Sequence, residues 1–516
     1  MNILPKNLSP VIIFIALAIG ISAQTPDPSP AASPKEIKPP AQTISYLRSE
    51  IAMALADPSL RRGQVGVKIV SSRTGETVYE RNAQNYFMPA SNMKSFTVAA
   101  AIDRLSPGFR FKTSVYSLTE PDSNGTVIGD LVIYGRGDPT FSEAFSEDQP
   151  YKRFDELADA IVAAGVKTVS GSIVGDETFF NTAPIPFGWE WDDLQWYYGA
   201  EISSLSIFDN AIELKVLPST AGAQCVVQTT PLTRFVRIIN KTTTVAPGGK
   251  RRLRVTKLLG QNVIEVAGNM PENDKGYSGR VAFSKPSELF AEVLSNRLRM
   301  KGVNIKGGIR AIDREDRGGT RLPVESYKEI ASTFSPPLSI IAAKTMKPSQ
   351  NLYTELLLRT LGETVTAAED TETTSDKKGI DAVQKLLGRA GVEPRSVVQY
   401  DGSGLSRHNL ITPDSAVKLY LYMDRGNNSI VWRNALTIGG VDGTLRNRFK
   451  GTSAEGNVRG KTGTLDQVSA LSGYVNSKSG ERFVFSVLTN YIPNSRLRTS
   501  TIDKIVVLLA DYDGVL

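Results

Sequence analysis

Three short motifs of serine, lysine and threonine constrain the fold of this chain more than any other feature. They are Ser91-Asn92-Met93-Lys94, Ser349-Gln350-Asn351 and Lys461-Thr462-Gly463. Each offers a polar group that acyl-transfer chemistry can use without a histidine. A fold that uses all three has to bring both ends of the chain to one site, and the long segment between the first two motifs must form an insertion.

Histidine and cysteine are nearly absent, which narrows the possible chemistry. The only histidine is His408 and the only cysteine is Cys225. A Ser-His-Asp triad would depend on His408 alone, an internal disulfide cannot form, and the usual zinc clusters lack ligands. We therefore expect no metal and no organic cofactor. We also expect His408 on a loop or the surface, and Cys225 as a small buried apolar residue.

Length and charge set the broad class. A chain of 516 residues predicts two or three domains. The formal net charge is +7, without a dense Lys/Arg tract, so nucleic-acid binding is not indicated. This charge fits a basic surface with no special partner, and it fits equally a surface that binds an anionic polymer.

The first 42 residues have the composition of an export signal followed by a spacer. Residues 1–23 combine Lys6, an apolar run over 11–21 and a small-residue end at Ala23, where we expect cleavage. An uncleaved anchor is the alternative, although the run is short for a bilayer. Residues 24–42 are proline-rich and predict an extended spacer. The sequence thus predicts an exported periplasmic or cell-envelope protein with no stable membrane span after signal removal.

Residues 43–111 and 331–516 predict one domain that carries all three motifs. We expect an α+β fold, an antiparallel sheet with helices on both faces. Proline is expected in the first turn of two of the helices, which open at 335–337 and 412–413. Polar residues 367–378 are expected to form a mobile loop. The expected strands are 65–70, 77–79, 456–464, 469–475 and 482–490, and the expected helices are 51–56, 93–105, 335–345, 352–361, 413–422 and 496–512.

Residues 112–330 have a different pattern, in which short β-like runs alternate with turns. We expect a large β-rich α/β insertion that forms a domain region of its own. Its expected strands are 126–134, 171–174, 212–216, 235–239, 253–256 and 263–266, and its expected helices are 153–165 and 286–302.

Ser91 and Lys94 are the candidate nucleophile and base. Residues three apart share one face of a helix, so both side chains point the same way at a helix N-terminus. Lys94 can accept the serine proton only when neutral, which requires desolvation or a nearby cation to lower its pKa. The alternative is an N-cap serine followed by a surface lysine.

Ser349 and Asn351 lie just before an apolar helix. An ordinary helix cap is one interpretation of this motif. In the functional interpretation, Ser349 relays a proton to the leaving amine, and Asn351 hydrogen-bonds both Lys94 and the substrate backbone.

Lys461-Thr462-Gly463-Thr464 is expected on a strand that can pair with an extended peptide. Lys461 and Thr462 would hold a terminal carboxylate, and Gly463 leaves room for close backbone approach. The N–H of Thr464 would join that of Ser91 in an oxyanion hole. Residues 456–462 resemble a phosphate-binding loop, but they have one residue too few between the glycines and precede a strand instead of a helix.

In this order, the motifs resemble those of the D-alanyl-D-alanine carboxypeptidase/endopeptidase group of penicillin-binding proteins, the class C or peptidase S13 family. The resemblance runs from about residue 43 to the C-terminus and includes the long insertion. Gln350 departs from the family, which often has Asp there, and we expect the change to be tolerated. Four further segments are similar to the family: 134–139, 198–200, 401–407 and 440–445.

The resemblance implies a penicillin-binding/β-lactamase-like transpeptidase fold and a serine-type D-Ala-D-Ala carboxypeptidase, a D,D-endopeptidase, or both. Ser91 would attack the carbonyl of a D-Ala-D-Ala-type bond in peptidoglycan peptides, and water would release the acyl-enzyme. β-Lactams would acylate Ser91 and inhibit the enzyme. Residues 401–407 would lie near the rim of the site with no chemical role. Glu355 is not placed like the deacylating glutamate of class A β-lactamases, so fast lactam hydrolysis is not indicated.

Two other functions stay open at this point. A β-lactamase-like or esterase serine hydrolase of the same superfamily predicts fast lactam or ester turnover. A non-catalytic peptidoglycan-binding protein predicts that Ser91→Ala leaves its activity in cells unchanged. The residues alone favour neither carboxypeptidase nor endopeptidase activity, and they fix no oligomeric state.

Overall fold

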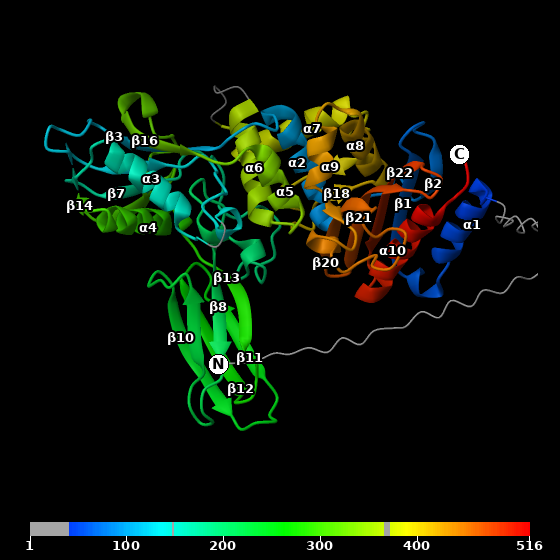
Figure 1. Cartoon of the computed structure of the whole chain (residues 1–516), viewed down its shortest axis with the longest axis horizontal. Helices are drawn as coiled ribbons and strands as arrows, with labels where there is room; N and C mark the ends of the chain where they lie inside the picture. Colours follow the sequence, from blue (N-terminus) through cyan, green and yellow to red (C-terminus); the bar gives the residue numbers. More distant parts are fainter. Residues whose placement is uncertain (1–40, 147–148, 366–371) are drawn as a thin grey trace, which may run out of the picture. The chain divides into compact units, whose positions relative to one another are not determined.

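The computed structural model describes residues 41–146, 149–365 and 372–516 (Figure 1). The predicted signal at 1–23 and nearly all of the spacer at 24–42 lie outside these ranges. In the part of the chain that is described, no helix combines the length and the apolar character that crossing a membrane requires.

A six-stranded antiparallel sheet joins the two ends of the chain, as predicted. Its order is β19-β20-β21-β22-β1-β2. N-terminal β1 pairs with C-terminal β22 from Gln64 opposite Asn490 to Ser71 opposite Phe483. In Figure 1 the blue strands β1 and β2 lie beside the orange strands of the C-terminal part. The strands are β1 (Gln64–Ser71), β2 (Thr77–Arg81), β19 (Thr437–Ile438), β20 (Arg459–Leu465), β21 (Val468–Asn476) and β22 (Arg482–Asn490).

Helices cover both faces of this sheet, because apolar residues alternate along its strands. On β22, Phe485 and Val487 join the core with α1 (Ile44–Ala54) and α10 (Ser495–Asp511). Val484 and Leu488 point to the opposite core. This arrangement is the predicted α+β fold. The second face packs against α2 (Met93–Leu105), α5 (Leu338–Met346), α6 (Asn351–Val365), α7 (Ser375–Arg389), α8 (Pro413–Arg425) and α9 (Ser429–Ala435).

The described residues from β3 to β16, between the first two motifs, contain four smaller sheets and the α-helices α3 and α4, which share one core apart from a small aromatic cluster. A mixed five-stranded sheet has the order β15-β7-β5-β3-β16, and a parallel one has the order β14-β6-β4. These elements are β3 (Lys112–Ser117), β4 (Thr126–Val127), β5 (Leu131–Tyr134), α3 (Lys152–Ala163), β6 (Thr168–Val169), β7 (Ile173–Asp176), α4 (Pro286–Met300), β14 (Asn304–Ile305), β15 (Ile309–Ile312) and β16 (Lys328–Phe334).

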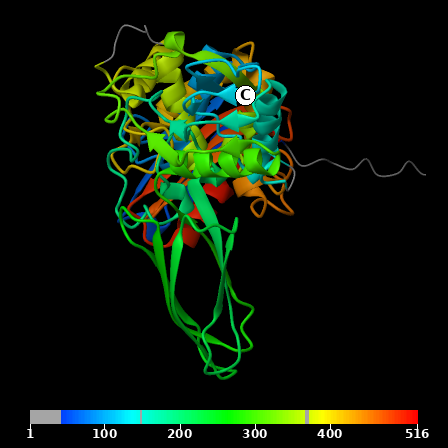
Figure 2. The same cartoon turned by 90° about the vertical axis from the view of Figure 1, so that its left-hand side faces the viewer.

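The other two sheets, β13-β8-β9 and β10-β12-β11, carry the longest strands of this segment, drawn in green in Figure 2. Cys225 is buried in their core, as predicted. The predicted domain limits at 111/112 and 330/331 stay a prediction, and β16 spans the second limit. The strands are β8 (Ala211–Leu217), β9 (Val226–Thr230), β10 (Arg237–Val245), β11 (Arg252–Lys257), β12 (Val263–Pro271) and β13 (Tyr277–Ala282), while β17 (Val397–Val398) pairs with β18 (Leu410–Ile411) elsewhere.

Four local predictions were wrong. The strand expected at 126–134 is split into β4 and β5, because Gly129 has a left-handed backbone (φ 93°). β20 starts at Arg459 instead of at 456, after a turn. Helix α5 starts at Leu338, so Pro337 is its N-cap and not a first-turn residue. Residues 367–371 of the expected loop are not described, but 375–378 are helical, and the first turn of α7 is fixed to α6 by a hydrogen bond from Ser375 Oγ to Glu363. The start of α8 at Pro413 agrees with the prediction.

Candidate active site

The Ser91 side chain projects from a tight turn at the start of α2. A 3₁₀ turn over Ala90–Asn92 leads directly into the helix, and Ala90 has a left-handed backbone (φ 48°) that is costly for a residue with a Cβ. Ser91 stays partly exposed, whereas Lys94 one turn later is fully buried. Lys94 Nζ lies 2.9 Å from Ser91 Oγ. The turn therefore offers the hydroxyl to a ligand and keeps the amine out of water.

Lys94 is held by two further acceptors. Its Nζ donates to Asn351 Oδ1 at 2.6 Å and to the Ser403 carbonyl at 2.7 Å. Asn351 Nδ2 donates to the Tyr198 carbonyl at 2.8 Å, which fixes the amide so that its oxygen faces Lys94. Asn351 is the first residue of α6, so helix packing positions it. Three separate segments of the chain thus meet at one amine, and Tyr198 from a fourth segment orients one of them.

Burial lowers the pKa of Lys94 from 10.5 to about 7, although the charges of Asp401 and Glu355 oppose this shift. A lysine with this pKa is partly neutral near pH 7 and can act as a proton acceptor. The sequence predicted that Lys94 needs a lowered pKa to act as a base, and the structure shows that desolvation lowers it.

Lys461 of the third motif and Ser349 of the second motif contact each other. Lys461 Nζ donates to Ser349 Oγ at 2.9 Å and to the Thr462 carbonyl at 2.9 Å. Burial, followed by the charge of Lys94, holds the pKa of Lys461 well below its usual value. Ser349 has a left-handed backbone (φ 65°), a strained conformation of the kind that clusters at functional sites. Thr462 Oγ1 donates to Thr444 Oγ1 at 2.7 Å.

Gly463 was expected to leave room for the backbone of a bound peptide, but the structure gives this glycine another role. A Cβ at this position would collide with the Pro89 carbonyl, so the backbone that approaches is the chain's own turn before Ser91. Asn92 Nδ2 adds a hydrogen bond of 2.8 Å to the Lys461 carbonyl. Gly404 serves the same turn, since a side chain there would collide with the Ala90 carbonyl. Both glycines let the turn that carries Ser91 pack against its neighbours.

Gly463→Ala should lower the rate of penicillin acylation by about a hundredfold, because displacing a nucleophile by about an ångström has an effect of that order. Stopped-flow or gel-based labelling would measure the rate. Gly108→Ala is the matched control, since a Cβ there meets no atom within 4 Å. Equal acylation rates in the two variants would contradict this role of Gly463.

The segment 401–407, to which the sequence assigned no chemical role, contributes to the site. Its Ser403 carbonyl accepts from Lys94, and Ser403 N–H donates to Glu355 Oε1 at 2.8 Å. Glu355 is fully buried and pairs with Arg359 at 2.8 Å. Burial raises the pKa of Glu355 to about 7, with a further increase from the charge of Asp401. The Asp401 carboxylate orders the loop by accepting from the N–H groups of Gly404, Ser406 and Trp189.

The remaining predicted residues occupy less central positions. Thr464 is exposed on β20 beside Gly463, where its backbone can face a ligand. His408 is an exposed loop residue against Phe187, as predicted. Among residues 41–146, 149–365 and 372–516, no group of three or more His, Cys, Asp or Glu side chains is placed to hold a metal ion.

A family model for the D-Ala-D-Ala carboxypeptidase 3 (S13) family matches residues 47–512. The chain belongs to this family. Membership of the S13 family makes it a serine-type peptidase of the hydrolase class, as the motifs predicted. The "D-alanyl-D-alanine carboxypeptidase" of Actinomadura sp. (strain R39) is 33% identical over 482 residues, which cover 91% of this chain and 86% of that protein.

Solved structures share the fold. Penicillin binding protein 4 (dacB) from Haemophilus influenzae matches with a TM-score of 0.74 and 22% identity, over 89% of this chain and 97% of that one. Its complex with a β-lactam matches with a TM-score of 0.69 and 21% identity, over 88% and 97% of the two chains. These matches confirm the predicted penicillin-binding-protein fold.

Sequence reasoning missed three groups of the S13 site: the carbonyls of Tyr198 and Ser403 and the hydroxyl of Thr444. Each belongs to a segment that was noted only because it resembles the family. Their resemblance to the family was the signal that could have found them. No spacing rule, however, connects a loop carbonyl to a lysine hundreds of residues away.

Proposed function

We propose that this S13 peptidase is exported and hydrolyses the terminal D-Ala-D-Ala bond of peptidoglycan peptides through an acyl-enzyme on Ser91. The observation that carries the proposal is the buried Lys94 amine, whose pKa is about 7 and which lies 2.9 Å from the Ser91 hydroxyl. The apolar run and small-residue end of residues 1–23 support export.

The hydrogen bonds of Lys94 favour its action as the base. A neutral amine has two N–H groups, and these go to Asn351 Oδ1 and the Ser403 carbonyl, which carry no proton to give. The lone pair is then left for the Ser91 hydroxyl proton. As Lys94 takes this proton, Ser91 Oγ bonds to the substrate carbonyl carbon, and the N–H groups of Ser91 and Thr464 stabilise the oxyanion.

Breakdown of this intermediate breaks the C–N bond and requires a proton on the leaving amine. Ser349 Oγ relays to the amine the proton that Lys94 took from Ser91, so Lys94 becomes neutral again; the Ser349 hydroxyl is next to Lys461, on the strained loop before α6. Lys461 and Thr462 hold the carboxylate of the departing D-Ala. Water then attacks the ester, with Lys94 again accepting a proton, and Ser91 regains its hydroxyl.

Incubation of purified protein with a peptide ending in Lys-D-Ala-D-Ala tests the proposal. We expect stoichiometric release of D-Ala, inhibition by penicillin and a mass increase of one penicillin per chain, located on the peptide that contains Ser91. Fast turnover of penicillin or of simple esters without D-Ala release would favour a β-lactamase or esterase. If the protein is not labelled by penicillin and releases no D-Ala, a non-catalytic peptidoglycan-binding protein is favoured. This outcome would overturn the proposal.

A further inference from the structure

Residues 211–282, which form β8 to β13, carry the whole formal net charge of the chain. They contain eleven Lys and Arg residues against four Asp and Glu residues, so their net charge is +7, the same as that of the full sequence. The rest of the chain is therefore neutral overall. Residues 250–254, Lys-Arg-Arg-Leu-Arg, are basic at four of five positions, which corrects the expectation that the chain has no dense basic tract.

The alternation of side chains along a strand gives the sheet β10-β12-β11 a buried face and an outward face. Ile264, Val266 and Met270 of the central strand β12 are buried in the core of this segment. The residues between them therefore point outward, as do their neighbours in the register. The strands are drawn in green in Figures 1 and 2. The outward positions are 237, 239, 241 and 243 on β10, 263, 265, 267 and 269 on β12, and 252, 254 and 256 on β11.

This outward face carries four cations and one carboxylate. The cations Arg237, Lys241, Arg252 and Arg254 are all exposed, and they give a net charge of +3 together with Glu265. Glu265 accepts a hydrogen bond from Lys241 at 2.5 Å and lies 3.7 Å from Arg254. Among the described residues, the side chains of Arg237 and Arg252 have no ion pair and no hydrogen bond. The face thus keeps two cations that are free to bind a ligand.

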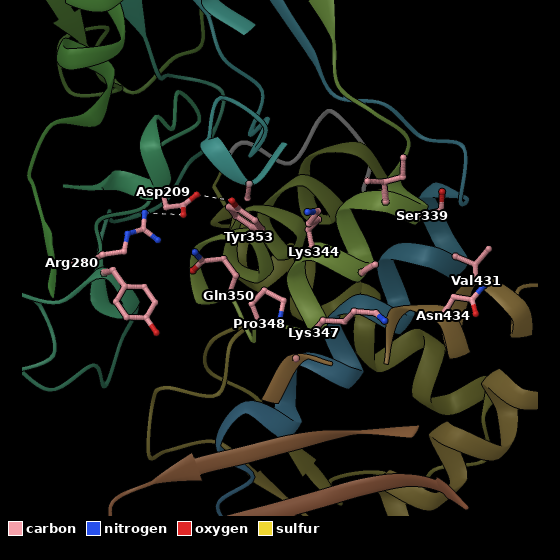
Figure 3. Close-up of a pocket in the computed structure, with 15 residues that line it drawn as sticks. Asp209, Arg280, Ser339, Lys344, Lys347, Pro348, Gln350, Tyr353, Val431 and Asn434 are labelled. Atoms are coloured by element: carbon pink, nitrogen blue, oxygen red, sulfur yellow. Dashed lines mark hydrogen bonds and ion pairs between the residues drawn. The ribbon is translucent and has the colours of Figure 1, made fainter. Parts of the chain in front are cut away.

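Other cations of residues 211–282 are paired or buried. Arg280 contacts Asp209 at 2.9 Å, an ion pair that Figure 3 marks with a dashed line. Arg251 contacts Asp274 at 3.2 Å. Lys257 is buried on the inward face of β11. These three cations have little left to offer a ligand, unlike Arg237 and Arg252.

The arrangement of the cations on the outward face suits a linear anionic ligand. Lys241 and Arg254 both lie opposite Ala267, so they are about 10 Å apart across the central strand. Arg252 and Arg254 are about 7 Å apart along β11. Between these long side chains, β12 presents the short side chains of Ala267 and Asn269, neither of which can insert into a bilayer. Charge on both sides of a strand with short side chains favours a chain that lies along β12.

We propose that the outward face of β10-β12-β11 binds a linear anionic polymer with a phosphodiester in each repeat. Arginine suits this ligand, because its guanidinium group donates two parallel hydrogen bonds to a phosphate. Three of the four cations on the face are arginines. The binding uses none of the residues that act on the peptide bond, so it goes beyond the peptidase function and does not depend on it.

Fluorescence anisotropy of labelled poly(glycerol phosphate), titrated with the purified protein at several salt concentrations, tests the proposal. Wild type should bind, and its affinity should fall steeply as salt rises. Arg237→Gln/Arg252→Gln removes the two unpaired cations, so it should weaken binding about tenfold and reduce the salt slope by about one to two units. Arg237→Lys/Arg252→Lys keeps the charge and should retain most of the affinity.

The control is Arg104→Gln/Arg496→Gln, which removes the same charge from exposed positions on α2 and α10 and should bind like wild type. Unchanged penicillin labelling shows that each variant is folded. Equal losses in the two glutamine variants would mean that net charge alone attracts the polymer, and would overturn the assignment. It is also overturned if wild type does not bind the polymer at 150 mM salt, on the order of the physiological ionic strength. Binding to vesicles of phosphatidylglycerol and phosphatidylcholine without binding to the polymer would assign the face to a membrane instead.

Discussion

Ser91→Ala should abolish penicillin labelling and lower D-Ala release by at least about 10⁴-fold. The loss is this large because no other hydroxyl can form the acyl-enzyme, and loss of a serine nucleophile removes most of the rate enhancement in enzymes of this kind. Labelled penicillin on purified protein measures the first effect, and a D-Ala release assay measures the second.

The fold of the variant should be intact, because Ser91 contributes one partly exposed hydroxyl to the structure. Ser500→Ala, which removes an exposed hydroxyl on α10, is the control and should label like wild type. Equal labelling of Ser91→Ala and wild type would place the nucleophile elsewhere.

Lys94→Met should slow acylation by about 10³-fold, the upper part of the range for general base catalysis. Methionine fills similar apolar volume, so the loss reports the amine instead of a cavity. In wild type, the pKa of about 7 predicts that the neutral form dominates above pH 7 and is lost as pH falls. The acylation rate should therefore reach a plateau above pH 8 and be about tenfold lower at pH 6.

Measured penicillin acylation rates between pH 5.5 and 9 check both effects. Lys385→Met removes an exposed amine and should keep the wild-type rate and pH profile. A wild-type profile that is flat between pH 6 and 8, or a Lys94→Met variant with an unchanged rate, would exclude Lys94 as the base. Glu355 also has a pKa of about 7, so Glu355→Gln should be measured to assign the transition.

Several features were predictable because they follow from local geometry. Ser91 and Lys94 are one helical turn apart, so any helix at that place brings them together. Residues 482–490 were expected to form a strand, and β22 has these bounds. Thr412 and Pro413 carry a capping signal that works without tertiary contacts.

Other features depended on contacts that no local rule describes. The first turn of α7 has a polar, acidic sequence typical of a loop, yet it packs against α6. Gly463 suggested space for a ligand, whereas the Pro89 carbonyl occupies that space. Gln350 looked like a neutral change within a motif, and only the structure shows that its side chain is buried, with 7% of it exposed.

The sequence by itself determined the order of the three motifs and that both ends of the chain build one domain, and it predicted which residues react. Motif chemistry and strand or helix periodicity are properties of short segments, so they can be deduced from the printed letters. The tertiary structure alone decided the pKa of Lys94, the acceptors around it and the contact between Lys461 and Ser349. Desolvation and hydrogen bonding at these points come from segments far apart in the chain, and only the folded packing brings them into contact.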